Sequence, residues 1–235
     1  MDKIYIVMPA YNEQENIESV VLSWYSVLEG KSKQSKLVVA DSGSTDKTHE
    51  ILKKLQKENL QLEILSDTGK QHGPKLLALY DYAIKSGADY IFQTDSDGQT
   101  IPEEFVQFWD LREKYDVILG KRLYRGDGIL RKLVEDILCI LLKLYFRVEL
   151  PDANAPYRLM KTEIVKKYLY DLPQDYNLPN VMLTTYFKYY KERIKFVSIT
   201  FKSRQGGKNS INISKIIRIG WKALYDFNKL KKSMK

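Results

Sequence analysis

Short runs of apolar and β-branched residues alternate along the chain with longer stretches whose apolar residues recur at helical spacing. The runs predict strands, and the stretches predict helices between them. In the first half we expect strands at residues 3–8, 37–40, 62–65, 90–93 and 117–120. The helices between them are expected at residues 13–28, 45–58, 75–86 and 102–114. This alternation predicts an α/β fold with a mostly parallel sheet covered by helices on both faces.

The second half is less regular. It predicts a helix with an unusually wide apolar surface, a short strand, a second helix and a further strand, at residues 130–147, 155–160, 178–190 and 194–202. A basic, glycine-containing loop follows. The apolar residues of 213–231 then recur at helical spacing, with basic residues between them. We therefore expect one domain over residues 1–210 and a basic amphipathic C-terminal helix over residues 211–235.

Composition limits the class of protein. The 235 residues, 44% hydrophobic and 29% charged, suffice for one domain with a full core. A single cysteine excludes an internal disulfide, which is typical of a reducing compartment. We expect neither a signal peptide nor a transmembrane helix, because no run of about 18 apolar residues occurs. Of the net charge of +8, seven units lie from Lys208 onward, which suggests an anionic partner such as nucleic acid or lipid head groups.

Polar segments follow four of the expected strands. Ligands of parallel sheets bind beyond the carboxyl ends of the strands, so these segments should meet at one edge. The sharpest is Asp95-Ser96-Asp97-Gly98-Gln99. Its two carboxylates, one residue apart at a strand end, can converge on a hard cation such as Mg²⁺ or Mn²⁺, and Gln99 could add a carbonyl oxygen. An Asp-Gly turn that only caps the next helix would have the same sequence.

The loops after the first and second strands have two interpretations as well. Asp41, at the tip of the second strand, could accept hydrogen bonds from a nucleobase. Ser44 or Thr45 would cap the following helix, whose N-terminus favours a negative ligand. Tyr11 could stack on a base, and Glu13 could accept protons from a ribose or a base. A capped loop and a plain helix start would use the same residues without any ligand.

Three motifs in order carry a family resemblance: VMPAYNEQENI, VVADSGSTDKT and HGPKLLALYDYAIKSGADYIFQTDSDGQ. From Ile4 to about Arg122 they resemble glycosyltransferase family 2, which has the GT-A fold. DANAPYRLM and RQGGKN resemble, more weakly, the dolichol-phosphate mannose synthase branch, which includes the bacterial polyprenyl-phosphate enzymes. The resemblance implies a metal-dependent transfer of a sugar from a UDP- or GDP-linked donor. The implied cofactor is Mg²⁺ or Mn²⁺, and the implied acceptor is a dolichyl or undecaprenyl phosphate.

The resemblance also implies roles residue by residue. The nucleotide would be held by Pro9, Tyr11, Glu13, Asp41 and Asp95. The metal would be held by Asp95, Asp97 and Gln99. Phosphates of donor and acceptor would be bound by Arg122, Arg158, Arg204 and Lys208. The residues expected to act in catalysis are Asp97, Arg122, Arg158 and Arg204. Asp97 would act through the metal, and the arginines would act on the phosphates, because guanidinium forks match phosphate geometry. Taken alone, each arginine could equally be a solvated charge or part of an ion pair.

The chain departs from the family pattern in places. Family members often have two consecutive acids where this chain has Ala40-Asp41, and the Gln-x-x-Arg-Trp signature of processive synthases is absent. Asp152 and Asp175 are the candidates for a general base, and neither is unambiguous. A sugar hydroxyl needs such a base. A lipid monophosphate does not, because its second pKa is about 6. This favours a polyprenyl-phosphate acceptor. Together with the arginines, it also favours a single displacement at the anomeric carbon, with inversion of configuration.

The basic C-terminal helix predicts attachment to an anionic membrane, so we expect a cytoplasmic protein, peripheral on the inner face. A helix docked on the domain is the alternative. The apolar surface of residues 130–145 could be a second interfacial element, part of the core, or a homodimer contact. Competing functions are transfer to a sugar hydroxyl in polysaccharide or glycolipid synthesis and a catalytically silent module that recruits partners to membranes. No nucleic-acid-binding motif is found, so no specific nucleic acid is expected.

Overall fold

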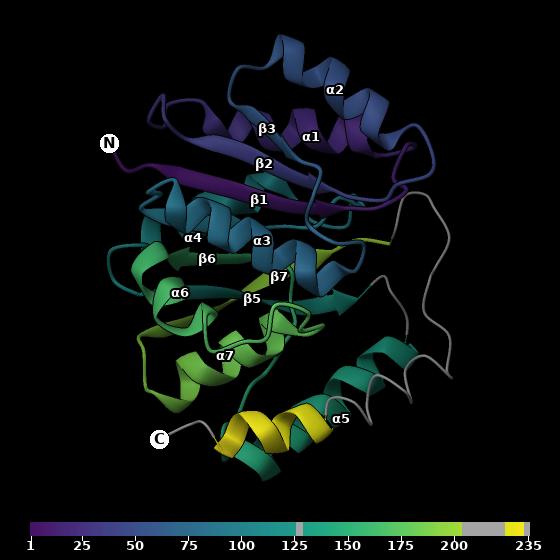
Figure 1. The fold of residues 1–235 in the computed structure, drawn as a ribbon. Helices are drawn as coiled ribbons and strands as arrows, with labels where there is room; N and C mark the ends of the chain where they lie inside the picture. The colour runs from purple at the N-terminus through teal and green to yellow at the C-terminus, as the bar shows by residue number, and fades with distance from the viewer. Residues whose placement is uncertain (126–128, 204–223, 233–235) are drawn as a thin grey trace.

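Seven strands form one sheet within residues 1–125, 129–203 and 224–232, which are the residues that the computed structural model describes (Figure 1). The order across the sheet is β3-β2-β1-β4-β6-β5-β7. The strands are β1 (Ile4–Ala10), β2 (Lys36–Asp41), β3 (Leu62–Leu65), β4 (Tyr90–Gln93), β5 (Val117–Arg125), β6 (Arg158–Lys161) and β7 (Ile194–Phe201).

The strand directions explain why polar loops meet at one edge. β1 pairs in parallel with β2 and β4, β2 pairs in parallel with β3, and β5 pairs in parallel with β7. Only β6 among the described strands runs the other way, between β4 and β5. The predicted mostly parallel α/β fold is therefore confirmed. The carboxyl ends of β1, β2 and β4 lie side by side.

Helices cover both faces because the central strands are apolar on both sides. Along β1, Ile4, Ile6 and Met8 face one core cluster, while Tyr5 and Val7 face the other. The helices that cover the first face are α1 (Ile17–Tyr25), followed by a 3₁₀ turn at Ser26–Leu28, α2 (Thr48–Glu58) and α4 (Phe105–Leu111), preceded by a 3₁₀ turn at Pro102–Glu104. Those that cover the second are α3 (His72–Lys85), α5 (Ile129–Phe146), α6 (Thr162–Leu169) and α7 (Pro179–Tyr189).

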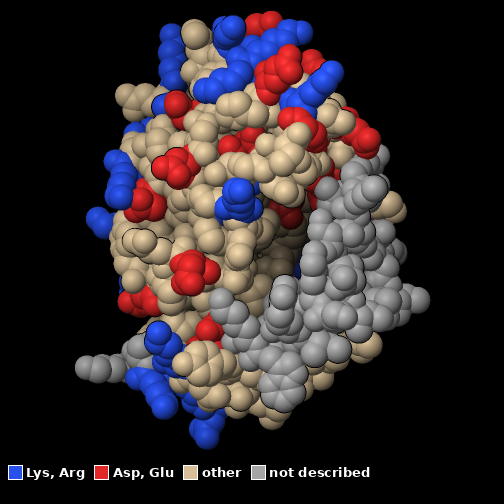
Figure 2. All heavy atoms as spheres, turned by 45° about the vertical axis from the view of Figure 1, so that its right-hand side comes forward, with Lys and Arg blue, Asp and Glu red and all other residues tan. Residues whose placement is uncertain are grey.

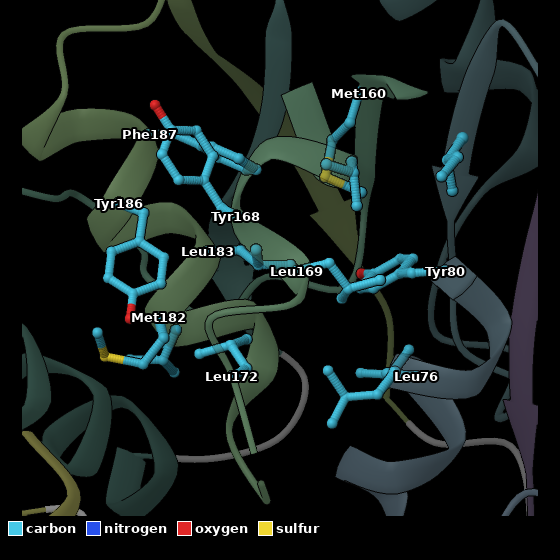
Figure 3. Packing of buried hydrophobic residues seen from close by; sticks show 14 of the residues in the cluster. Leu76, Tyr80, Met160, Tyr168, Leu169, Leu172, Met182, Leu183, Tyr186 and Phe187 are labelled. Atoms are coloured by element: carbon cyan, nitrogen blue, oxygen red, sulfur yellow. The ribbon is translucent and has the colours of Figure 1, made fainter. Parts of the chain in front are cut away.

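The second core cluster joins α3 to α7 and supports the carboxyl end of β4. Figure 3 shows Leu76 and Tyr80 of α3 facing the side chains of α6 and α7, among them Leu169 and Leu183. All four side chains are buried. Residues of α3 and α7 therefore have fixed positions behind the end of β4.

Part of the predicted C-terminal appendage lies on the domain. Residues 224–232 are helical and lie beside α5 (Figure 1). Phe227 is fully buried and packs edge-on against Phe146, with 5.6 Å between the ring centroids. Leu230 is buried in the same cluster. These two apolar side chains of the predicted amphipathic helix thus contact protein, and residues 211–223 and 233–235 lie outside the described part.

One side of α5 stays exposed. Leu133, Ile137, Ile140 and Leu144 recur at helical spacing, and each is at least 49% exposed. The opposite side of the helix contributes Leu142 and Phe146 to the core. In the part of the chain that the structure describes, no helix is both long enough and apolar enough to cross a bilayer.

Candidate active site

The first group of candidate residues lies where β1 and β2 end. Ala10 and Asp41 are paired in register, so the loops that follow start side by side. Hydrogen bonds connect these loops directly: the Asn12 amide donates to Ser44 Oγ at 3.0 Å, and the Glu13 amide donates to Thr48 Oγ1 at 2.8 Å. The loops after β1 and β2, at residues 11–16 and 42–47, are therefore joined at the sheet edge, and together with Asp41 they are called the Asp41 rim.

Ser44 and Thr45 do not cap α2, contrary to the prediction. The Ser44 hydroxyl donates to Asp41 Oδ1, and the Thr45 amide donates to Asn12 Oδ1 at 2.8 Å. The amide of Thr48, the first helical residue, instead donates to Asp46 Oδ1 at 3.0 Å. The two side chains serve the contact between the loops, which local sequence does not reveal.

Asp41 is held by residues that sequence reasoning missed. Its carboxylate is buried, and Oδ2 lies 3.0 Å from Nδ1 of His49, the second residue of α2. Lys75 of α3 is buried nearby and donates to the carbonyl of Ala10. Burial lowers the pKa of the Lys75 ammonium, and the charge of Asp41 acts in the opposite direction. The sequence signal for Lys75 was a lysine on the expected apolar face of a helix.

Tyr11 offers an exposed ring above these charges. Its side chain is half exposed, and the Lys75 ammonium lies 5.2 Å from the ring centroid. Glu13 is buried and accepts a hydrogen bond from Asn16 Nδ2 at 3.3 Å. Pro9 is buried at the end of β1. The structure thus brings together four of the predicted nucleotide-binding residues, and Tyr11 is the one among them that presents an open surface.

Asp95 and Asp97 follow β4 at the same edge. The intervening Ser96 is buried and donates to the carbonyl of Pro9 at 2.9 Å, which fixes this turn to the end of β1. Burial raises the pKa of the Asp95 carboxyl above its ordinary value, and the charge of Asp97 raises it further. A divalent cation would relieve this repulsion, so the pair fits the predicted metal site.

Gln99, predicted to add a carbonyl oxygen to the metal site, is held through the nitrogen of its side-chain amide. Its side chain is buried, and Nε2 donates to the carbonyl of Lys202 at 2.7 Å. The Lys202 amide donates back to the Gln99 carbonyl at 2.8 Å. Gln99 therefore connects the Asp95–Asp97 turn to the end of β7. No group of three or more His, Cys, Asp or Glu side chains placed to hold an ion occurs among the described residues.

Arg122 is engaged by the protein. It donates to Asp152 through Nε at 2.7 Å and through Nη2 at 2.8 Å, and its Nη2 lies 3.4 Å from Glu135 Oε2. All three side chains are nearly fully buried. The predicted phosphate-binding role does not match this bidentate pair, and Asp152 is equally unsuited to be a general base. Glu135 was missed because it lies in a mainly apolar helix.

Arg158 also differs from its predicted role. Its guanidinium is fully buried, donates to Thr184 Oγ1 at 2.6 Å and donates to the carbonyl of Asn180 at 3.2 Å. Burial lowers the pKa of this group. Arg158 therefore supports the packing of α7 on β6 and does not face a ligand. Arg204 and Lys208 lie outside the described residues.

The face at the strand ends is hollowed. Figure 2 looks at the side to which the strand arrows of Figure 1 point, and it shows a hollow with acidic side chains near its upper rim. A carboxylate pair, a buried carboxylate beside a lysine, and an exposed aromatic ring are placed at this edge. Together they suit a ligand with a base at one end and phosphates at the other.

Comparison with known proteins decides the family. The model of the family described as "Glycosyl transferase family 2" matches residues 5–169. This chain belongs to glycosyltransferase family 2. The matched span contains the Asp41 rim and the Asp95–Asp97 pair, so both groups of candidate residues lie inside the family domain.

Curated relatives of this family 2 protein are distant. It is 22% identical over 218 residues to an undecaprenyl-phosphate 4-deoxy-4-formamido-L-arabinose transferase of Yersinia enterocolitica, which covers 92% of this chain and 65% of the relative. It is 26% identical over 170 residues to the enzyme of that name from Photorhabdus laumondii, covering 71% of this chain and 51% of the relative. The family 2 chain thus spans about half to two thirds of these relatives.

Solved structures confirm the GT-A-like fold of the family 2 protein. Glucosyl-3-phosphoglycerate synthase from Mycobacterium tuberculosis, in complex with Mn²⁺, UDP-glucose and phosphoglyceric acid, superposes with a TM-score of 0.72 at 19% identity. That match covers 98% of this chain and 80% of the other. The UDP complex of the same enzyme gives a TM-score of 0.68 at 19% identity. At this identity the likeness establishes the fold.

Proposed function

We propose that this chain transfers a sugar from a nucleotide-diphosphate donor to a polyprenyl phosphate. The observation that carries the proposal is the Asp95–Asp97 pair beside the Asp41 rim, at the strand ends of a family 2 fold. This arrangement supplies places for the base, the diphosphate and a divalent ion along one edge. A direct attack by the acceptor on the anomeric carbon, in a single displacement, would invert its configuration.

The nucleoside end of the donor would lie on the Asp41 rim. Each carboxylate oxygen of Asp41 already accepts one hydrogen bond, from Ser44 or His49, and each can accept another from a base. The exposed ring of Tyr11 offers a stacking surface. Buried Lys75 holds the Ala10 carbonyl, which fixes the start of the Tyr11 loop.

The diphosphate end would lie at Asp95 and Asp97, which would hold Mg²⁺ or Mn²⁺. When bound, the ion neutralises the negative charge that develops on the leaving diphosphate. The chain's own contribution is to hold the two carboxylates close together, where burial and the charge of Asp97 raise the pKa of Asp95. Arg204 and Lys208 remain our candidates for further phosphate contacts.

The acceptor is inferred from the surroundings of the two candidates for a general base and from the names of the relatives. Asp152 is committed to Arg122, and exposed Asp175 borders a small cavity beside the helix of residues 224–232. A phosphate oxygen needs no base and can attack the anomeric carbon as the bond to the diphosphate breaks. The curated relatives are named for transfer to undecaprenyl phosphate, which agrees with such an acceptor.

We also propose that the protein sits on the cytoplasmic surface of an anionic membrane, where a polyprenyl phosphate would be found. Because Phe227 and Leu230 are buried, the apolar contact would come from the exposed side of α5. Lysines exposed on the neighbouring helix are Lys229, Lys231 and Lys232. A helix with apolar residues on one side and cations beside it suits an anionic interface.

Liposome sedimentation tests the membrane part of the proposal. Replacing Ile137 and Ile140 with serine should lower the fraction of protein bound to anionic vesicles by several-fold. The matched control is Val106→Ser, which changes an exposed apolar residue on α4, on the other face of the sheet. If the double variant binds as the parent does, α5 is not the contact surface.

The decisive experiment for the reaction is a transfer assay. Candidate donors carry UDP or GDP, and the acceptors are undecaprenyl phosphate and a panel of sugar hydroxyls, each with Mn²⁺. Asp95→Asn and Asp97→Asn should each lower transfer by about 100-fold or more, because the leaving group loses its neutralising ion. Asp110→Asn, an exposed aspartate on α4, is the matched control and should leave the rate unchanged.

Two results would overturn the proposal. Transfer to sugar hydroxyls but never to the lipid phosphate would place the protein in polysaccharide or glycolipid synthesis. No transfer or donor hydrolysis with any nucleotide sugar would leave a silent module on a family 2 fold.

A further inference from the structure

A chain of buried polar side chains leads from Asp95 into the core. It starts at Gln93, the last residue of β4, whose Nε2 donates to Asp95 Oδ1 at 3.2 Å. Gln93 is fully buried. A neutral amide at this place orients the carboxylate without cancelling its charge.

The other end of the Gln93 amide is fixed by two different helices. Gln93 Oε1 accepts a hydrogen bond from Asn180 Nδ2 of α7 at 2.9 Å. The hydroxyl of Tyr80, from α3, lies 2.8 Å from Asn180 Oδ1 and 3.3 Å from Gln93 Oε1. Because an ionised Asp95 carboxylate only accepts hydrogen bonds, Gln93 presents its NH₂ to Asp95 and its oxygen to Asn180 Nδ2. The oxygen of Asn180 then faces the Tyr80 hydroxyl.

Arg158 anchors the far end of this chain. It lies directly opposite Gln93 in the β4–β6 register, and its guanidinium donates to the carbonyl of Asn180 at 3.2 Å. A second donation, at 2.6 Å, goes to Thr184 Oγ1 one turn further along α7. The N-terminal turn of α7, and Asn180 with it, is held in place by these bonds.

Burial of this many polar groups is costly unless every partner is present. Apolar side chains could fill the same space, as they do in the surrounding cluster of Leu76, Leu183 and their neighbours (Figure 3). Gln93 is the member of this hydrogen-bonded row that contacts Asp95, so the row can fix the position of the Asp95 carboxylate.

We propose that Gln93 and Asn180 are positioning residues that hold the Asp95 carboxylate in the orientation needed to bind the divalent ion together with the donor diphosphate. The inference rests on the proposed function and adds to it the residues that set the geometry of the metal site. Partners behind a metal ligand typically change metal affinity by about 10- to 100-fold when replaced.

The test measures binding of Mn²⁺, by the loss of its free EPR signal, in the presence of whichever of UDP and GDP stabilises the parent protein. Gln93→Met should weaken Mn²⁺ binding by about 10-fold. The Mn²⁺ concentration for half-maximal transfer should rise equally, and kcat should recover at saturating Mn²⁺. Thr185→Val is the matched control. Thr185 is buried on α7, as Asn180 is, but its described hydrogen bond, to the Val181 carbonyl at 2.8 Å, stays within the helix.

A double substitution tests whether the residues act in series. Asn180→Leu should weaken Mn²⁺ binding, and adding it to Gln93→Met should cause no further loss, because the effect reaches Asp95 only through Gln93. Tyr80→Phe keeps the core filled and should give the smallest loss. If circular dichroism shows that the amide variants do not fold, Mn²⁺ binding by Tyr80→Phe is measured in their place.

The outcomes separate the two proposals. A parent protein that binds no Mn²⁺ with either nucleotide overturns the proposed function. A parent that binds Mn²⁺, with a folded Gln93→Met binding it equally well, overturns the positioning role alone. Where the amide variants do not fold, equal binding by Tyr80→Phe has that meaning. Lower thermal stability with an unchanged Mn²⁺ constant would show that the polar chain is only structural.

Discussion

The buried pair of Arg122 with Asp152 makes a strong prediction, because sequence and structure assign it different roles. The guanidinium contacts both carboxylate oxygens of Asp152, at 2.7 and 2.8 Å, and Glu135 lies at 3.4 Å. The side chains of Arg122 and Asp152 are 7% and 4% exposed. Arg122→Met keeps most of the apolar stem and removes the charge, so Asp152 stays buried without this partner.

The expected cost follows from that burial. Removing one partner of a buried pair typically destabilises a protein by about 3–5 kcal/mol, whereas an exposed pair contributes about 0–1 kcal/mol. For a chain of this size, about 3–5 kcal/mol corresponds to a fall in Tm of roughly 6–20 °C. Neutralising Asp152 as well, in Arg122→Met with Asp152→Asn, should restore at least half of the lost stability.

Urea unfolding followed by circular dichroism measures the free energy of unfolding of each variant. Lys143→Met is the matched control, because Lys143 lies 62% exposed on α5 beside Glu149, which is 74% exposed. It should change the free energy of unfolding by less than about 0.5 kcal/mol.

One pattern would refute the reasoning. If Arg122→Met unfolds at the same urea concentration as the parent and loses activity only through a higher KM for the acceptor, then Arg122 binds phosphate as the sequence suggested. The buried contact with Asp152 would then be exchanged for the substrate during the reaction.

Three further predictions concern pH and packing. Because burial and Asp97 raise the pKa of Asp95, and a metal ligand must be deprotonated, Mn²⁺ binding should weaken on acidification at a pH above the ordinary aspartate range, as titrations between about pH 8 and pH 5 would show. Arg193 and Lys161 lower the pKa of Asp116 to about 2, so its stabilisation is complete above its ordinary pKa and is lost as the pH falls through about 2. Asp116→Asn should therefore cost about 1–2 kcal/mol near neutral pH after allowance for the exposed arginine, and nothing at the lowest pH, in urea unfolding. Gly73→Ala gains about 1 kcal/mol of helix propensity but places Cβ 2.2 Å from the Tyr176 carbonyl oxygen, so a net fall in Tm of several degrees is expected by calorimetry.

The strand and helix order could be read from the sequence because each element carries its own pattern. Short, mainly apolar runs located β3 and β4 at their observed bounds, residues 62–65 and 90–93. β5 was expected to end at Gly120 but continues to Arg125, because pairing with β7 extends it. That pairing joins segments about 75 residues apart and leaves no local trace.

Helix starts were less predictable than helix bodies. α3 begins at His72, three residues before the predicted start, because Pro74 occupies the first turn, where its missing amide hydrogen costs nothing. α6 was not predicted at all. Its eight residues are few for a periodic pattern, and its stability comes from buried contacts such as those of Tyr168 and Leu169.

In the candidate site, too, some features could be predicted from the sequence and others could not. The positions of Asp41, Asp95 and Asp97 at one edge followed from the parallel sheet alone. The surroundings of Arg122 and Arg158 did not, because their partners come from other elements: Asp152 for the first, and Asn180 with Thr184 for the second. An arginine that resembles a phosphate ligand in sequence can be fully occupied by carboxylates and carbonyls, and only the tertiary contacts distinguish the two cases.

These contacts concern the charges around Asp95 and Asp97, which we propose as the metal ligands. Arg122 lowers the pKa of Asp95, but the contacts of its guanidinium with Asp152 and Glu135 reduce the positive charge that reaches Asp95. The direct donor to Asp95 is instead the neutral amide of Gln93. A cation in that place would hold the carboxylate equally well but would repel a divalent ion through the same contact. An amide fixes the carboxylate and keeps its negative charge available, which is what binding a metal with a diphosphate requires.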